Sequence, residues 1–163
     1  MKIFYAVEAN TIIEEVPEFK ELLRLDTELV DYIDSSFVYE SAHAADEAEQ
    51  LLREADLYEN RFKLVHIEQC TKGETFEDFA IVTSTNSYLI MECICAFTII
   101  GGTKEAVQMA ILQLEEHLIC VSFHNSSAIY VVEHHLKDLV KGIAKAYDIE
   151  VSFFELDKQE KTL

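Results

Sequence analysis

Residues Tyr88–Ile100, with the sequence YLIMECICAFTII, form a long apolar run that is closed by Gly101, Gly102 and Thr103. The run has no polar face at helical spacing and is rich in isoleucine, which favours extended backbone. It therefore predicts one strand that is covered on both faces. A carboxylate, Glu92, interrupts the run. This side chain either lies buried beside a basic partner or is exposed at a strand edge.

The segments after the glycines alternate between helical and extended patterns. Residues 104–114 carry apolar side chains three and four positions apart, which is typical of an amphipathic helix, and residues 136–147 repeat the pattern. Between them, residues 118–123 and 128–132 predict two strands joined by the polar turn His124–Ser127. The alternative is one helix over residues 104–123. Strand is favoured because Ile119, Cys120 and Val121 are together poor helix formers.

The first half of the chain is strongly acidic. Residues 1–60 contain 16 Asp and Glu against 4 Lys and Arg, a net charge of −12 out of −18 for the whole chain. A strand is expected at residues 2–7, and a helix capped by Ser41. Pro17 opens another helix, whose apolar stripe reaches Ile33 and is either continuous or broken near Asp26 and Thr27. We therefore predict an acidic, helix-rich N-terminal half over residues 1–70 and an α+β half over residues 71–163. A single continuous domain is the alternative.

Charge and cysteine content limit the classes of partner and compartment. A net charge of −18 argues against nucleic acid and anionic membranes as partners, because binding either requires a basic face. The same charge suits docking on a basic protein. The residues after Met1 do not form a signal peptide, and the four cysteines lie in apolar segments without disulfide-like spacing. The expectation is a reduced, cytoplasmic protein.

Residues 89–155 follow the order strand, helix, strand, strand, helix, strand, which is the ferredoxin-like pattern. Three segments, AFTIIGGT (96–103), EHLICVSFHNSS (116–127) and AIYVVEHHLKDLVK (128–141), resemble ACT domains, the nearest resemblance being to those of aspartokinases and amino-acid-sensing proteins. The resemblance implies a regulatory module that forms a homodimer and binds a small effector such as an amino acid. Carried over by position, the effector site comprises Gly101, Gly102, Thr103, Ser122, His124 and Asn125. The chain lacks the Pro-Gly pair that commonly opens the first helix of the family.

Other candidate sites have structural explanations. Thr103 can simply cap a helix after a tight turn. Adjacent His134 and His135 point about 100° apart on a helix, and neither they nor Cys93 and Cys95 have metal-ligand spacing, so no metal or cofactor is expected. No nucleophile–base pair is recognisable, so we predict a protein that is not an enzyme. The alternative function is an acidic inhibitor or immunity-type protein whose helices, within residues 17–57, bind a basic protein partner. An enzyme ranks third.

Overall fold

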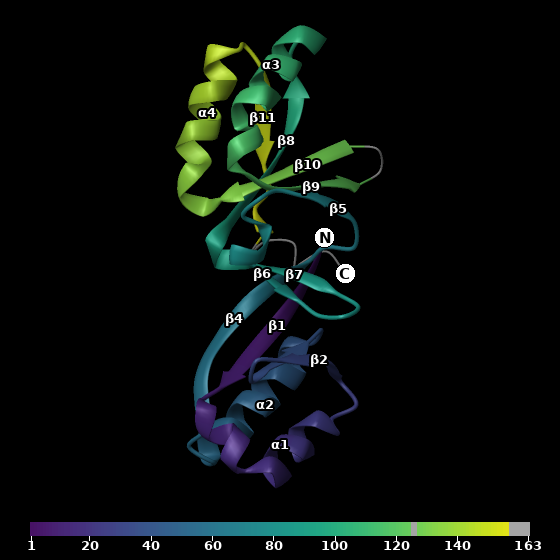
Figure 1. Ribbon diagram of the computed structural model, residues 1–163, viewed down its shortest axis with the longest axis vertical. Helices are drawn as coiled ribbons and strands as arrows, with labels where there is room; N and C mark the ends of the chain where they lie inside the picture. Colours follow the sequence, from purple (N-terminus) through teal and green to yellow (C-terminus); the bar gives the residue numbers. More distant parts are fainter. Residues whose placement is uncertain (125–126, 157–163) are drawn as a thin grey trace. The chain divides into compact units, whose positions relative to one another are not determined.

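A computed structural model describes residues 1–124 and 127–156 (Figure 1). The chain divides into two compact units: residues 1–66 with 81–90, and residues 67–80 with the chain from Met91 onward. We call these the first and the second unit. None of the helices in the described ranges combines the length and the apolar composition needed to cross a membrane.

The first unit is built on a six-stranded antiparallel sheet with two helices. Its strand order is β2-β3-β1-β4-β7-β6. The strands are β1 (Lys2–Ala9), β2 (Leu29–Ile33), β3 (Ser36–Tyr39), β4 (Tyr58–His66), β6 (Ala80–Val82) and β7 (Ser87–Ile90). The helices are α1 (Pro17–Arg24), which follows a short 3₁₀ turn at Thr11–Glu15, and α2 (Ala42–Glu54).

Strand β1 is buried on both faces. Its side chains point alternately to one face and the other, and each face contributes to a different cluster of apolar side chains. Val7 and Ala9 point to the face that α2 covers, in a cluster with the helix residues Ala48 and Leu52. Phe4 and other residues of the opposite face form a second cluster with Val38, Leu64 and Tyr88. The period of two along an extended strand produces this division.

One of the two sheets curls into a half-barrel, and a contact between β2 and β7 identifies it as the sheet of the first unit. Strands β2 and β7 are separated in the strand order by β3, β1 and β4. Even so, the carboxylate of Asp31 on β2 accepts hydrogen bonds from the side chains of Tyr88 on β7 and of Asn86 just before it. The curl therefore encloses the face that carries the Tyr88 cluster.

The second unit contains a five-stranded antiparallel sheet with the order β11-β8-β10-β9-β5. The strands are β5 (Cys70–Lys72), β8 (Ile94–Gly101), β9 (Leu118–His124), β10 (Ser127–Glu133) and β11 (Glu150–Phe153). Helices α3 (Lys104–Leu114) and α4 (Lys137–Ala146) lie side by side in Figure 1. They pack together through Ala110 and Ala144, and Leu114 and Val140 reach the core around Phe97.

The fold class predicted from the sequence is wrong. The chain is not a helix-rich N-terminal half joined to a ferredoxin-like half, but a mixed α/β protein with two antiparallel sheets and about 40 % strand. In the N-terminal half, α1 ends at Arg24, and the apolar residues up to Ile33 belong to β2. The apolar residues of 29–33 are mostly β-branched or aromatic, so they favour extended backbone over helix. In the second unit, β5 (Cys70–Lys72) adds a fifth strand from upstream of residues 89–155, the stretch predicted to be ferredoxin-like.

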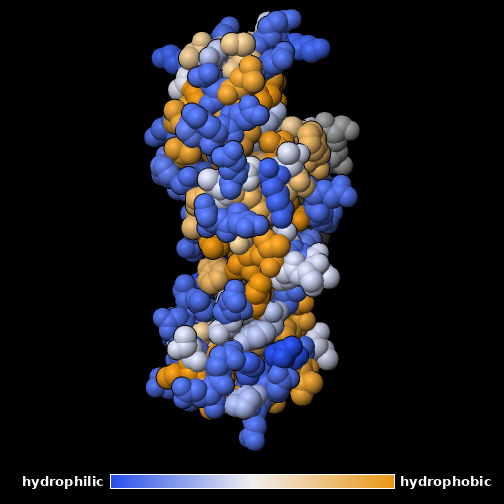
Figure 2. Space-filling view, viewed as in Figure 1, coloured by the Kyte–Doolittle hydropathy of each residue, from blue (hydrophilic) through white to orange (hydrophobic). Residues whose placement is uncertain are grey.

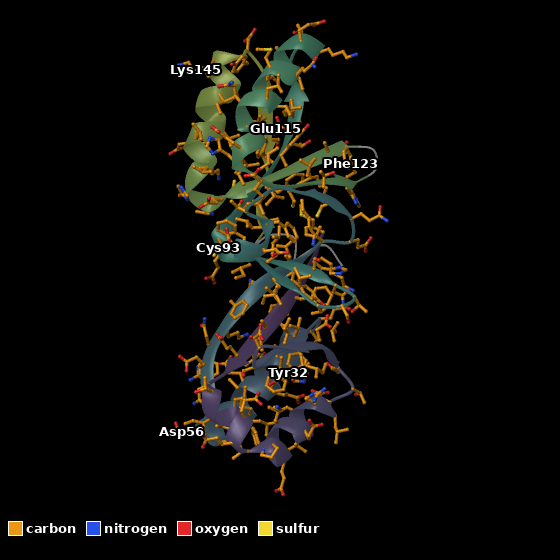
Figure 3. All side chains as sticks on the ribbon, viewed as in Figure 1. Tyr32, Asp56, Cys93, Glu115, Phe123 and Lys145 are labelled. Atoms are coloured by element: carbon orange, nitrogen blue, oxygen red, sulfur yellow. The ribbon has the colours of Figure 1, made fainter. Side chains whose placement is uncertain are left out.

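The run Tyr88–Ile100 is not one strand. It is divided by a 3₁₀ turn at Met91–Cys93, so that β7 belongs to the sheet of the first unit and β8 to that of the second. Glu92 and Cys93 are exposed in this turn, and Cys93 is labelled in Figure 3. The carboxylate inside the apolar run therefore marks the point where the strand breaks, and the exposed alternative for Glu92 is the correct one.

Several local predictions are confirmed. Residues 118–124 and 127–133 pair as an antiparallel hairpin, so the alternative of one helix over 104–123 is wrong. Pro17 opens α1, and the hydroxyl of Ser41 accepts a hydrogen bond from the Ala44 N–H of α2 (3.4 Å). These are local signals, set by capping and by the spacing of apolar residues.

Candidate functional site

A cleft of ≈ 420 Å³ lies beside the double glycine in the second unit. Three parts of the chain form it: the end of β8 with the loop that follows, the first turn of α3, and the start of β10. The lining residues are Thr98, Ile99, Ile100, Gly101, Gly102, Val107, Ser127, Ala128 and Tyr130. This volume falls in the range of small-molecule sites, which is about 300–1,000 Å³.

The loop requires glycine at position 102. Gly102 has a φ of 129°, a conformation that side-chain-bearing residues rarely adopt. A Cβ atom there would also lie 2.7 Å from Cγ2 of Ile149. The backbone can therefore pass close to Ile149 and turn directly into α3.

Thr103 caps α3, as the sequence predicts. Its hydroxyl accepts a hydrogen bond from the Ala106 N–H (3.2 Å), and its carbonyl accepts one from the Val107 N–H (2.9 Å). The N-terminal turn of α3 therefore begins at the cleft, and Val107 of this turn is one of the lining residues. The positive end of the helix dipole favours a negatively charged group at this position.

The polar groups of the cleft are hydroxyls rather than charged side chains. Thr98 donates its hydroxyl hydrogen to the carbonyl of Ala128 (2.9 Å), which ties β8 to β10. Ser127 is exposed at the opening. Tyr130 stacks on Phe97 with 5.4 Å between ring centroids, and burial raises the pKa of its phenol, so the phenol stays protonated and can donate a hydrogen bond.

Of the five predicted site residues that lie in the described part of the chain, Gly101 and Gly102 line the cleft and the other three do not. Thr103 lies next to it as the helix cap. Ser122 is buried on β9, where its hydroxyl donates a hydrogen bond to the carbonyl of Gln69 (3.0 Å), and His124 is exposed at the end of the same strand. Asn125 lies outside the described residues. Strand β10 separates β9 from β8, which is why the β9 residues are not among those that line the cleft.

Sequence reasoning missed Ser127, Ala128 and Tyr130. They face the glycine loop because β10, not β9, pairs with β8, with Tyr130 opposite Phe97. These residues could be identified only by knowing which strands are neighbours in the sheet, and the periodicity of apolar residues does not give that order.

A separate hollow of ≈ 460 Å³ in the second unit is lined in part by Cys95, His134 and Lys137. Burial raises the pKa of the Cys95 thiol, which disfavours the thiolate that a nucleophile requires. His134 points its Nδ1 at the carbonyl of Ile94 (3.4 Å). Within residues 1–124 and 127–156, no group of three or more His, Cys, Asp and Glu side chains could hold a metal ion.

Comparison of the chain with protein-family models, with curated proteins and with solved structures finds no match. The resemblance to ACT domains therefore stays a prediction from the sequence.

Proposed function

We propose that the protein is a regulatory module that is not an enzyme, and that it binds a small effector in the cleft beside Gly101 and Gly102. The observation that supports this most strongly is the position of the cleft at the N-terminal turn of α3. The effector class is the one that the ACT resemblance implies, an amino acid or a related small carboxylate. A homodimer and a cytoplasmic location belong to the same proposal.

The composition of the cleft suggests how such a ligand would lie. A carboxylate would face the first turn of α3, where the helix dipole is favourable. The apolar part of the ligand would contact Ile99 and Val107, and the hydroxyls of Ser127 and Tyr130 would orient it. Since none of the described residues that line the cleft is charged, an amino acid would keep its ammonium group in contact with solvent.

A thermal-shift screen tests the proposal. The purified chain is heated with each of the amino acids and with simple carboxylic acids, and the ligand that binds raises the melting temperature in proportion to its concentration relative to Kd. Affinity is then measured by calorimetry for the wild type and for Ala128→Leu, whose larger side chain would occupy the cleft. We expect the variant to lose the binding signal.

Ala146→Leu serves as the matched control, because Ala146 is exposed at the end of α4 and is not among the lining residues. It should bind as the wild type does. A screen that raises the melting temperature for no ligand, together with a monomer by light scattering, would contradict the proposal.

A second function, an acidic inhibitor of a basic protein, has one specific observation in its favour. Each Lys and Arg between residues 1 and 62 forms an ion pair with a carboxylate of the first unit; these residues are Lys2, Lys20, Arg24, Arg53 and Arg61. The remaining carboxylates of this acidic region have no lysine or arginine within it to neutralise them. Residues 17–57 would therefore present a negative field to a basic partner.

The second function is tested by measuring the affinity of the chain for several basic proteins of different folds. A dedicated inhibitor should bind one of them far more tightly than the others, with an association rate that falls as salt is added. Equally weak binding to all of them would indicate charge attraction alone and would count against an inhibitor.

A further inference from the structure

The largest hollow of the second unit that we describe, with a volume of ≈ 740 Å³, lies away from the glycine loop. We call it the β5–α3 groove. One wall is the C-terminal end of α3 with the 3₁₀ turn Glu115–His117, and the other is β5 with the turn that follows it. The side chains of Ile111, Leu112, Leu118 and Val121 supply its apolar lining.

The outer face of helix α3 carries large apolar side chains next to polar ones such as Gln108. Its inner residues Ala110 and Leu114 are buried, but Met109 and Leu112 on the outer side are 49 % and 53 % exposed. The neighbouring helix α4 instead carries Asp138, Lys141 and other charged residues outward. Two large apolar side chains left exposed on one helix, next to an apolar groove, give this part of α3 the character of a contact surface. Figure 2 shows apolar surface between polar residues over the helices of this unit.

The opposite wall of the groove is held in place by Gly73. Its N–H donates a hydrogen bond to the carbonyl of Ile119 (2.8 Å). A Cβ atom at this position would lie only 1.9 Å from the carbonyl oxygen of Leu118. Only glycine permits this approach, so the turn after β5 is fixed against β9 and the groove exists before any partner arrives.

The rim of the groove is negatively charged. Three exposed carboxylates, those of Glu74, Glu115 and Glu116, line it, and Glu115 is labelled in Figure 3 at the end of α3. Lys72 is a basic residue of the described lining, and it places its ammonium group 4.6 Å from the ring centroid of Phe76. Apolar lining with an acidic rim is complementary to an occupant that carries both an apolar anchor and positive charge.

We propose that the β5–α3 groove binds a cationic segment of a partner protein, with a large apolar side chain of that segment seated against Leu112, Ile111 and Leu118. Lysine or arginine residues on either side of the anchor contact the rim carboxylates. The apolar anchor provides the specificity for this groove, because the whole chain is acidic and attracts positive charge at many places. This interaction does not depend on the effector cleft.

Fluorescence anisotropy with two labelled synthetic peptides tests the proposal. The first peptide contains lysines around leucine anchors, and the second has the same lysines with alanine in place of each leucine. We expect the full-length chain to bind the leucine peptide at least about tenfold more tightly, the difference that about 1.4 kcal/mol of anchor burial produces. Equal affinity for the two peptides would overturn the proposal, because charge alone would then explain the binding.

Protein variants locate the site. Leu112→Ser removes an exposed anchor contact, and Glu115→Gln with Glu116→Gln removes two rim charges; these side chains are exposed, so the fold should be retained. The matched control for charge, Glu15→Gln with Glu59→Gln, removes two exposed carboxylates from the first unit, outside residues 17–57. We expect each groove variant to weaken binding of the leucine peptide several-fold and the control to leave it within about twofold. If the control weakens binding as much as the groove variants do, or if the groove variants have no effect, the proposal is wrong.

Discussion

The phenol of Tyr88 donates a hydrogen bond to the carboxylate of Asp31 (2.5 Å), although the two residues are 57 positions apart in the chain and lie on strands separated by three others. The side-chain amide of Asn86 donates to the same carboxylate oxygen (2.7 Å), and Nε2 of His66 lies 3.1 Å from the amide oxygen of Asn86. This network joins β2 to β7 and closes the curled sheet of the first unit. It is formed by side chains, because β2 and β7 are not neighbours in the sheet.

Tyr88→Phe should therefore destabilise the first unit. The change removes one donor to Asp31 while keeping the ring that packs on Phe4 (5.3 Å between centroids). A hydrogen bond to a charged group contributes about 1.5–3 kcal/mol, so we expect the free energy of unfolding in urea to fall by that amount.

Tyr32→Phe is the matched control for Tyr88→Phe. Tyr32 also donates to a carboxylate, that of Glu14 (3.1 Å), but the Glu14 side chain is more than half exposed and water replaces the lost contact. Its loss of stability should be clearly smaller. Equal losses in the two variants would show that the Asp31 contact has no special role in closing the sheet.

Tyr39→Phe should have the opposite effect. Tyr39 is fully buried, and its hydroxyl has no hydrogen-bond partner among the described residues. A buried polar group without a partner costs about 1–3 kcal/mol, and phenylalanine removes that cost without changing the shape of the ring. We expect a higher midpoint of urea unfolding. A lower midpoint would mean that the hydroxyl contributes to the native packing.

Stability should fall at alkaline pH. Burial raises the pKa of the Tyr39 and Tyr88 phenols and of the Cys120 thiol, and the carboxylate of Asp31 adds to the effect on Tyr88. In the unfolded chain these groups ionise near their ordinary values, about 8.5 for cysteine and about 10 for tyrosine. The unfolded state therefore gains stability as pH rises through those values, while the folded state stays protonated.

Unfolding by urea at a series of pH values measures this dependence. The free energy of unfolding should decline from about pH 8.5 and more steeply above about pH 10. Cys120→Ala should reduce the earliest part of the decline, to which the buried thiol of Cys95 also contributes, and keep the later part. A curve that is flat up to pH 11 would contradict the burial of these groups.

Two glycines provide a test of backbone packing in the second unit. Gly73→Ala places a Cβ atom against the Leu118 carbonyl and should lower the free energy of unfolding by about 1–3 kcal/mol. Gly142→Ala, in the exposed middle of α4 with nothing within 4 Å of the new atom, should raise it by about 0.5–1 kcal/mol. Chemical denaturation of the two variants gives the sign of each change. The same sign for both would contradict the close approach at Gly73.

The features that could be predicted from the sequence are those set by neighbouring residues. The cap at Thr103, the opening of α1 by Pro17 and the hairpin of residues 118–133 depend on short-range patterns, and all three are present. The glycine loop was also identified, because a double glycine between a strand and a helix is a local signal.

The features that were missed depend on residues that are far apart in the chain. The curl that brings Asp31 to Tyr88 leaves no periodic pattern, and the short strand β5 has only three residues to indicate it. The apolar run at Tyr88–Ile100 predicts a single strand because its two parts are equally hydrophobic, although they enter different sheets. Tyr130 was missed as a cleft residue for the same reason, since its place beside the loop follows from strand order.

The proposed effector site is tested most directly by an NMR titration of the ¹⁵N-labelled full-length chain with the ligand selected by the thermal-shift screen. Binding in the cleft predicts that the amide signals of Gly101, Gly102, Val107, Ser127 and Tyr130 shift together with a single Kd, while the signals of the first unit stay in place. Shifts confined to other residues, or none at concentrations that saturate the thermal shift, would contradict an effector site beside the double glycine.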